Sequence, residues 1–312
     1  MKHNMKTYKC LLILLFCLIP ISQSFAIEAL KLQKVADNVY AIVGELGNRS
    51  PENLGNNATF GLVVTSEGVV LIDSGGTYKG AKEIHRLIKS ITDKPISTVI
   101  NTGGQDHRWL GNGYFKEQGA RLIASRKAVE DQKARTQDQF IRLGRLVGDE
   151  GIKGTDAVYA EKTFDDKLVF ELGNVKFEIF HNGQAHTPGD SFVWLPQQNV
   201  MFTGDIVYTQ RMLSIGSQSN SKSWVDVYQS MAAYKPEHIV PGHGQATDLA
   251  RADADTYDYL VFLRESVSAF IESGGDITEI GSLDQSKFSH LLNYKNLAGR
   301  NAQQVFTELE WE

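Results

Sequence analysis

The order of hydrophobic and polar positions predicts a chain of short strands and amphipathic helices. In the first half, apolar positions repeat every three or four residues over Thr77 to Ile91, which predicts a helix. Short runs rich in β-branched residues predict strands before and after it. These strand runs are residues 38–43, 59–65, 69–72 and 98–100. Strands alternating with helices are typical of an α/β fold.

The second half repeats this alternation. A long polar helix is predicted over residues 126–147, with a solvent-facing charged surface, and a loop follows over residues 148–160. A hairpin is predicted over residues 168–180, and later strands at 191–195, 200–203 and 238–240. Further helices are predicted at 112–118 and 224–234, from residue 246 onward, and at 296–309. The chain therefore predicts two β-α halves followed by a helical tail.

The first 26 residues have the pattern of a signal peptide. Lys2, Lys6 and Lys9 precede an apolar core over Leu11 to Ile21, which is short for a membrane span. Ser24-Phe25-Ala26 then matches the small-x-small pattern of a cleavage site. We expect cleavage after Ala26 and a periplasmic or secreted protein; the alternative is an uncleaved membrane anchor.

Composition after that cleavage narrows the class of partner. Of 312 residues, 286 remain, and both cysteines (Cys10 and Cys17) leave with the signal peptide. A chain without thiols suits an oxidising compartment, and its stability must come from a core. The net charge of −5 becomes −8 because three lysines and no acidic residues are removed. We expect a small-molecule substrate, no nucleic acid and no stable membrane association, and nothing indicates the oligomeric state.

Candidate metal ligands follow four of the predicted strands. Asp106 and His107 lie in the loop after residues 98–100, and His186, Asp205 and His243 each follow a β-like run. Side chains held at strand ends are positioned rigidly. Imidazoles and carboxylates gathered from separate strands are the ligands of a borderline divalent ion such as zinc.

Five motifs in order give the sequence a family resemblance. They are LIDSGG (71–76), INTGGQDH (100–107), GQAHTPGD (183–190), TGD (203–205) and VPGHG (240–244). This set resembles the metallo-β-lactamase-fold hydrolases, over about residues 35–248. The resemblance implies a four-layer αββα sandwich of α/β class with a helical C-terminal extension. We expect the signal peptide at 1–26, the sandwich domain at 27–250, and the extension packed on it at 251–312.

One motif departs from the family pattern. The usual loop is H-x-H-x-D-H, but the two leading histidine positions hold Thr102 and Gly104, or Gly103 and Gln105 in the other register. In the family those histidines and the equivalent of His186 hold the first metal. The resemblance assigns the second metal to Asp106, His107, Asp205 and His243. We therefore expect one tight ion and a weak or vacant first site, where His186 remains.

Several further residues are expected to support this site. The resemblance implies that Asp73 braces the metal loop through hydrogen bonds, although a turn-capping role is the simpler alternative. Arg211 follows Asp205 and suits an anionic substrate group, or is an ordinary surface arginine. His181 ends a strand and either supports the pocket or is a buried structural histidine. Hydrogen bonds to water or substrate at the missing ion's place are expected from Asn101, Thr102 or Gln105.

These expectations favour a metal-dependent hydrolase. A divalent ion lowers the pKa of a bound water towards about 7, which supports hydrolysis of an ester, thioester, lactone or lactam. Asp106 or His186 is the candidate catalytic base. Asp205 stands where the lactamase branch has cysteine, which favours a general hydrolase. Zinc is expected, with iron or manganese possible. The alternatives are a catalytically inactive metal-binding or ligand-binding module and, less favoured, an oxygen- or sulfur-handling iron enzyme.

Overall fold

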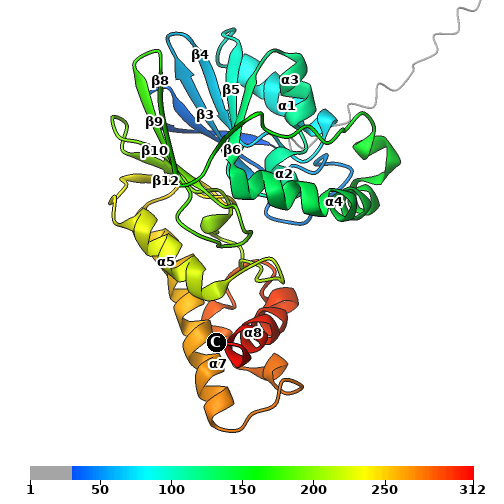
Figure 1. Ribbon diagram of the computed structural model, residues 1–312, viewed down its shortest axis with the longest axis vertical. Coiled ribbons are helices and arrows are strands. Elements are labelled where there is room, and N and C mark those ends of the chain that lie inside the picture. The colour runs from blue at the N-terminus through cyan, green and yellow to red at the C-terminus, as the bar shows by residue number, and fades with distance from the viewer. Residues whose placement is uncertain (1–29) are drawn as a thin grey trace, which may run out of the picture.

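Two β-sheets stacked face to face, with helices on their outer faces, form the architecture (Figure 1). The computed structural model describes residues 30–312. The predicted signal peptide at 1–26 lies outside these residues. Within residues 30–312 no helix is long and apolar enough to cross a membrane.

The first sheet has seven strands in sequential order. Its first four strands are antiparallel neighbours, and the pairs from β4 to β7 are parallel. The strands are β1 (Lys31–Ala36), β2 (Val39–Val43), β3 (Thr59–Thr65), β4 (Gly68–Ile72), β5 (Ile96–Asn101), β6 (Arg121–Ser125) and β7 (Lys162–Phe164). The parallel part directs the carboxyl ends of β4 and β5 to one edge, where the loop that follows β5 lies.

The second sheet has five strands in the order β12-β11-β10-β9-β8. Only the pair β11 and β12 is parallel. The strands are β8 (Lys167–Leu172), β9 (Val175–Phe180), β10 (Phe192–Leu195), β11 (Val200–Phe202) and β12 (His238–Val240). Because β9 and β11 are both antiparallel to β10, the carboxyl ends of β9, β11 and β12 meet at one edge. The loops that carry His186, Asp205 and His243 leave the sheet there.

The helices follow the predicted periodicity. In α1 (Tyr78–Lys89) the apolar residues Ala81, Ile84 and Ile88 are buried, and the Thr77 hydroxyl caps the first turn by accepting from Gly80 N–H. The other α-helices are α2 (Asp106–Trp109), α3 (Asn112–Glu117), α4 (Arg126–Ile152), α5 (Ser221–Ala232), α6 (Leu249–Ala252), α7 (Asp258–Glu272) and α8 (Tyr294–Glu310). Short helical turns are η1 (Gly204–Ile206), η2 (Asp253–Tyr257), η3 (Ile280–Ser282) and η4 (Ser286–Phe288).

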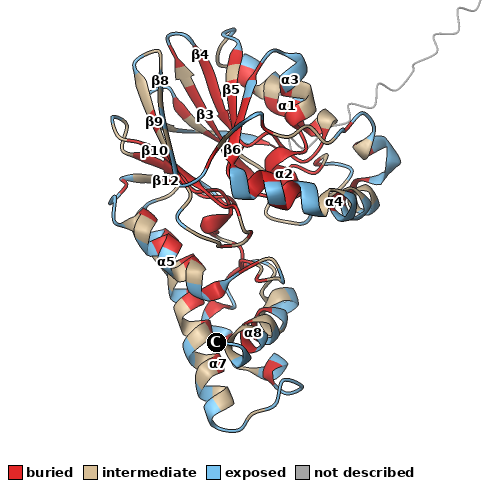
Figure 2. Ribbon diagram, viewed as in Figure 1, coloured by how far each residue is buried: buried red, intermediate tan, exposed pale blue. Residues whose placement is uncertain are grey.

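Three layers of hydrophobic contacts hold the sandwich together. Side chains such as Val63 and Ile100 of the first sheet pack between the sheets against Phe177 and Phe202 of the second. The outer face of the first sheet packs on α1, α3 and α4. Figure 2 shows the buried positions running along the strands and the inward faces of the helices. The predicted four-layer αββα arrangement is confirmed.

The C-terminal helices share a core with the second sheet. Trp194 of β10 and Trp224 of α5 belong to the same buried cluster as Leu260 of α7 and Phe306 of α8. The helical extension is therefore present and packs on the sandwich (Figure 1). The exact division into residues 27–250 and 251–312 stays a prediction, because this shared core gives no boundary.

The structure differs from the sequence expectations in two places. The predicted loop over residues 148–160 begins as helix, because α4 continues to Ile152 across a kink at Gly148, where φ is +74°. Glycine tolerates that backbone conformation, which other residues rarely adopt. The edge strands β1 and β7 were not expected. Their half-exposed side chains lack the continuous apolar run that marks the central strands.

Candidate metal centre

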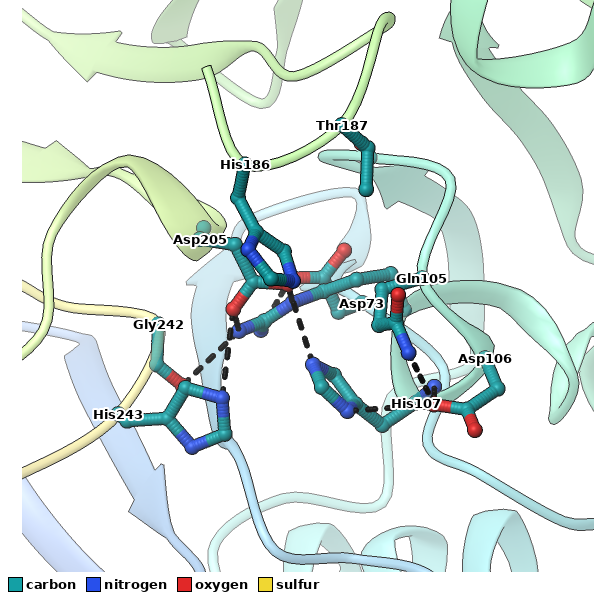
Figure 3. A network of polar contacts seen from close by, with 12 residues as sticks. Asp73, Gln105, Asp106, His107, His186, Thr187, Asp205, Gly242 and His243 are labelled. Atoms are coloured by element: carbon teal, nitrogen blue, oxygen red, sulfur yellow. Dashed lines mark hydrogen bonds and ion pairs between the residues drawn. The ribbon is translucent and has the colours of Figure 1, made fainter. Parts of the chain in front are cut away.

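Three buried side chains converge at the shared edge of the two sheets. His107 lies in the first turn of α2 after β5, Asp205 lies in η1 after β11, and His243 follows β12. One ligand atom from each lies within 4.8 Å of the others. The Asp205 carboxylate lies between the rings, 3.2 Å from His107 Nε2 and 3.3 Å from His243 Nε2 (Figure 3).

The imidazoles of His243 and His186 have a defined tautomer. His243 Nδ1 lies 2.8 Å from the Asn57 carbonyl oxygen, and His186 Nδ1 lies 2.9 Å from that of Ser214. A carbonyl oxygen only accepts, so each Nδ1 carries the proton and each Nε2 has a free lone pair. Burial lowers the pKa of His186 to about 4 and that of His243 well below its usual value. Both rings are therefore neutral, which is the form that binds metal.

This arrangement of side chains suits a divalent cation. His243 Nε2 and the Asp205 Oδ1 atom face each other at 3.3 Å, and both are acceptors when His243 is the Nδ1–H tautomer. Two buried acceptors this close suit a cation that both can contact. Two imidazole nitrogens and a carboxylate suit zinc and also accept iron or manganese.

Asp106 does not belong to the converging group. Its Oδ1 atom accepts a hydrogen bond from the Arg49 guanidinium and lies 3.4 Å from His107 Nδ1, on the far side of that ring (Figure 3). Burial alone would raise the pKa of Asp106, but the Arg49 charge holds it well below its usual range. Asp106 Oδ1 accepts from the His107 backbone N–H at 2.8 Å, and the Arg49 guanidinium lies 2.6 Å from His107 Nδ1, so Asp106 and Arg49 together position His107. The predicted ligation by Asp106 itself stays a prediction.

A buried arginine contacts several of the segments that form the site. Arg108 is fully buried, and its guanidinium donates to Asp205 at 2.7 Å and to Asp73 at 2.9 Å. It also donates to the backbone oxygens of Thr59 and Gly242. The guanidinium therefore links the carboxylate of the converging group to three other segments of the chain. Its charge holds the pKa of Asp205 well below its usual value, although burial alone would raise it.

The remaining predicted site residues divide into those that line a cavity and those that do not. A cavity of about 800 Å³ opens above the centre, lined by residues that include Gln105, His107, His186, Arg211 and His243. Asp73, Asn101 and His181 do not line the cavity and instead contact other protein groups. Asp73 accepts from Thr102 N–H at 2.7 Å, Asn101 donates to Arg108 O at 2.7 Å, and His181 Nδ1 contacts Asp190 O at 2.8 Å.

The loop where the first-site histidines are missing is filled by acidic side chains. A Cβ at Gly103 would collide with the Asp190 carboxylate, and one at Gly104 with the Asp131 carboxylate. Gln132 and Gln139 of α4 donate to the backbone oxygens of these two glycines. Burial raises the pKa of Asp190 to about 8. The loop is therefore built to exclude side chains at 103 and 104.

Gly104→Ala tests this packing. We expect it to lower the free energy of unfolding by about 1–3 kcal/mol, because the buried Asp131 carboxylate must move away from its pairing with Arg135. Thermal and urea denaturation would measure the change. Gly144→Ala is the matched control, since a Cβ there meets nothing within 4 Å and lies in the same long helix as Asp131. Equal stability of the two variants would contradict the expectation.

Comparisons with known proteins agree with this fold. The sequence profile of the Metallo-beta-lactamase superfamily matches residues 55–243. A metallo-beta-lactamase type 2 from Bacillus sp. (strain 170) is 28% identical over 211 residues, which cover 65% of this chain and 72% of the relative. One from Elizabethkingia meningoseptica is 25% identical over 226 residues, covering 70% and 80%. The solved metallo-beta-lactamase from Pontibacter korlensis superposes with a TM-score of 0.60 at 22% identity, over 74% of this chain and 99% of that one.

The αββα fold and the histidine-carboxylate donor set together define the class of metal-dependent hydrolases. The chain belongs to the metallo-beta-lactamase superfamily, because that profile spans more than half of it. The resemblance inferred from the five motifs is thereby confirmed. The Pontibacter likeness supports the fold alone. The names of the relatives do not determine the substrate of this chain.

Sequence reasoning missed two arginines of the centre. Arg49 lies in the turn-rich loop between β2 and β3, where nothing in the local pattern marks a residue that contacts Asp106 and His107. Arg108 directly follows His107, and a single arginine there reads as a surface residue. One signal was available. Asp73 and Asp205, both expected at buried strand ends, need a cation nearby if they remain ionised.

Proposed function

We propose that this chain is a secreted or periplasmic hydrolase that opens an acyl bond with one divalent ion. The bond is an ester, thioester, lactone or lactam, and zinc is the first candidate for the ion. His107, Asp205 and His243 would hold it, with His186 beside them. The observation that carries this proposal is the convergence of two imidazole nitrogens, from His107 and His243, on the buried Asp205 carboxylate.

The residues of the site have separable tasks. A bound divalent ion supplies Lewis acidity and lowers the pKa of a water molecule. His186 Nε2 faces the cavity with a free lone pair, so this atom is available to accept a proton from water. Asp106 is the poorer base, because the Arg49 charge keeps its carboxylate ionised and weakly basic. Arg211 is buried at the cavity wall, where its guanidinium suits an anionic group of the substrate.

Metal analysis together with a substrate panel tests the proposal. Protein purified without chelator should contain one equivalent of zinc, iron or manganese per chain. It should hydrolyse at least one member of a panel of acyl thioesters, lactones and β-lactams, and His243→Ala should abolish that activity. Metal-free protein that is inert on the whole panel would favour the inactive module instead. That second candidate is favoured by the filled loop at Gly103 and Gly104.

Removal of the metal should also lower stability. An ion at about a thousand times its dissociation constant stabilises the folded chain by about 4 kcal/mol. We expect EDTA to lower the melting temperature by several degrees, and added zinc to restore it. Differential scanning calorimetry of the full chain measures this. In His243→Ala the melting temperature should not respond to either addition; a response equal to that of the unaltered protein would place the metal elsewhere.

A further inference from the structure

The cavity above the metal centre is unusually rich in arginine. Six arginines line it, whereas Asp138 is its one acidic lining residue within residues 30–312. The whole chain has the opposite balance, with a net charge of −5. The arginines come from four separate segments: Arg49, Arg211, Arg300, and the three on α4, Arg135, Arg142 and Arg145. This local excess of positive charge therefore comes from the folded arrangement.

The inner arginines already have partners in the protein. Arg49 pairs with Asp106, and Arg135 pairs with Asp131. Arg211 donates to the backbone oxygen of Gly47 at 3.2 Å. These contacts explain why three of the six guanidinium groups lie at the cavity wall.

The outer three are exposed to solvent at the cavity, and no group in the described part of the chain pairs with them. Within residues 30–312, the guanidinium groups of Arg142, Arg145 and Arg300 make no hydrogen bond or ion pair with the protein. We call these three residues the outer arginines. Arg142 and Arg145 lie three residues apart on one face of α4, where like charges repel. Arg300 comes from α8; burial lowers the pKa of Arg142, and the charges of Arg49 and Arg300 lower it further.

Unpaired guanidinium groups around one cavity are suited to an anion. The planar fork of arginine donates two parallel hydrogen bonds to a carboxylate, sulfate or phosphate. The cavity volume of about 800 Å³ falls within the range of small-molecule sites. His107, His186 and His243 line the same cavity, so one ligand could contact both the metal centre and the outer arginines.

We propose that the outer arginines bind an anionic group at the end of the substrate remote from the bond that is hydrolysed. The group is a phosphate, a sulfate or a carboxylate. Describing the ligand as a substrate rests on the proposed hydrolase function, but the anion site itself requires no metal. It differs from the role of Arg211, which lies beside His243 at the metal centre.

Binding of probe anions to metal-free full-length protein tests the site directly. Pyrophosphate, sulfate and citrate would be titrated by isothermal calorimetry after removal of metal, so that chelation of an ion does not contribute. We expect at least one anion to bind, and its affinity to fall as salt rises. Arg300→Glu and Arg142→Glu should each weaken binding at least tenfold, since each removes a charged hydrogen-bond donor. The preferred probe distinguishes phosphate, sulfate and carboxylate.

Lys295→Glu is the matched control for Arg300→Glu. Lys295 is exposed on the same helix and does not line the cavity. Its substitution by glutamate changes the net charge by the same amount as Arg300→Glu. We expect it to leave anion binding within twofold of the unaltered protein. Absence of binding by all three probes would overturn the proposal, as would equal weakening by Lys295→Glu and Arg300→Glu.

A second measurement separates this proposal from the hydrolase function. Metal-loaded protein would be assayed on pairs of acyl substrates that differ only by a distal carboxylate or phosphate. We expect kcat/KM to be at least tenfold higher for the anionic member, and Arg300→Glu to remove that preference. If no substrate is turned over, the proposed hydrolase function is contradicted, but the anion site is not. Turnover without preference for the anionic member contradicts the outer-arginine site alone.

Discussion

Arg108→Ala is expected to lower the free energy of unfolding by about 3–5 kcal/mol. The guanidinium is fully buried between the carboxylates of Asp73 and Asp205, with side-chain exposures of 0%, 1% and 0% for the three groups. Removing it leaves two buried negative charges without their cation. A loss of this size is a large part of the 5–15 kcal/mol that stabilises a typical domain. Urea denaturation followed by circular dichroism measures it.

A surface ion pair provides the control for this prediction. Arg126 pairs with Asp165 at 2.7 Å, but both side chains are more than half exposed. Arg126→Ala should therefore cost only about 0–1 kcal/mol. Arg108→Lys should fall between the two, because an ammonium retains the charge but not the fork that donates to both carboxylates. A stability change for Arg108→Ala as small as that for Arg126→Ala would show that the buried network contributes little.

The second large effect is expected in metal affinity, where His107 and Asp106 should behave differently. His107→Ala removes a nitrogen of the converging group, so zinc affinity should fall by more than about 100-fold. Asp106→Asn keeps that nitrogen but weakens the contacts that Asp106 makes with Arg49 and His107, so the loss should be about 10–100-fold. Competitive zinc titration with a chromophoric chelator measures both.

The same titration discriminates the two roles considered for Asp106. If Asp106 is itself a ligand, as its place in the motif predicts, Asp106→Asn should lose zinc as completely as His107→Ala. His85→Ala is the control, because that histidine lies on α1 and bonds to the Tyr114 hydroxyl. Its zinc affinity should equal that of the unaltered protein.

The sequence was sufficient to predict the layers because burial on both faces leaves continuous apolar runs. The central strands β3, β4 and β5 are almost wholly buried and were predicted within two residues. The ligand-bearing loops were also predictable, since polar side chains directly after such runs lie at a sheet edge. The alignment of the 102–107 loop with the H-x-H-x-D-H motif was not predictable. It depends on Asp131 and Asp190 filling the space beside the two glycines, which are contacts between distant segments.

The polarity of α4 predicted its exposed face, but not that part of this face borders the cavity. Its charged side chains predicted a solvent-facing surface, and Arg126, Lys127, Glu130 and Lys133 are indeed exposed, whereas Asp131 is buried. Arg142 and Arg145 are exposed too, and they also line the cavity. Periodicity reports that a helix face is polar, but a polar face looks the same whether it meets bulk water or a polar pocket. The place of Arg300 could not be predicted from the sequence either, because it depends on how α8 packs near the cavity.

The cavity wall contributed by α8 has a consequence for how such an enzyme diversifies. The converging donor set lies before residue 244, whereas Arg300 belongs to the helical extension. Changes at exposed positions of that helix, such as Arg300, can alter which molecules are accepted and leave the hydrolytic machinery untouched. Selectivity and reactivity are thus encoded in different stretches of the gene, and each is free to evolve at its own pace.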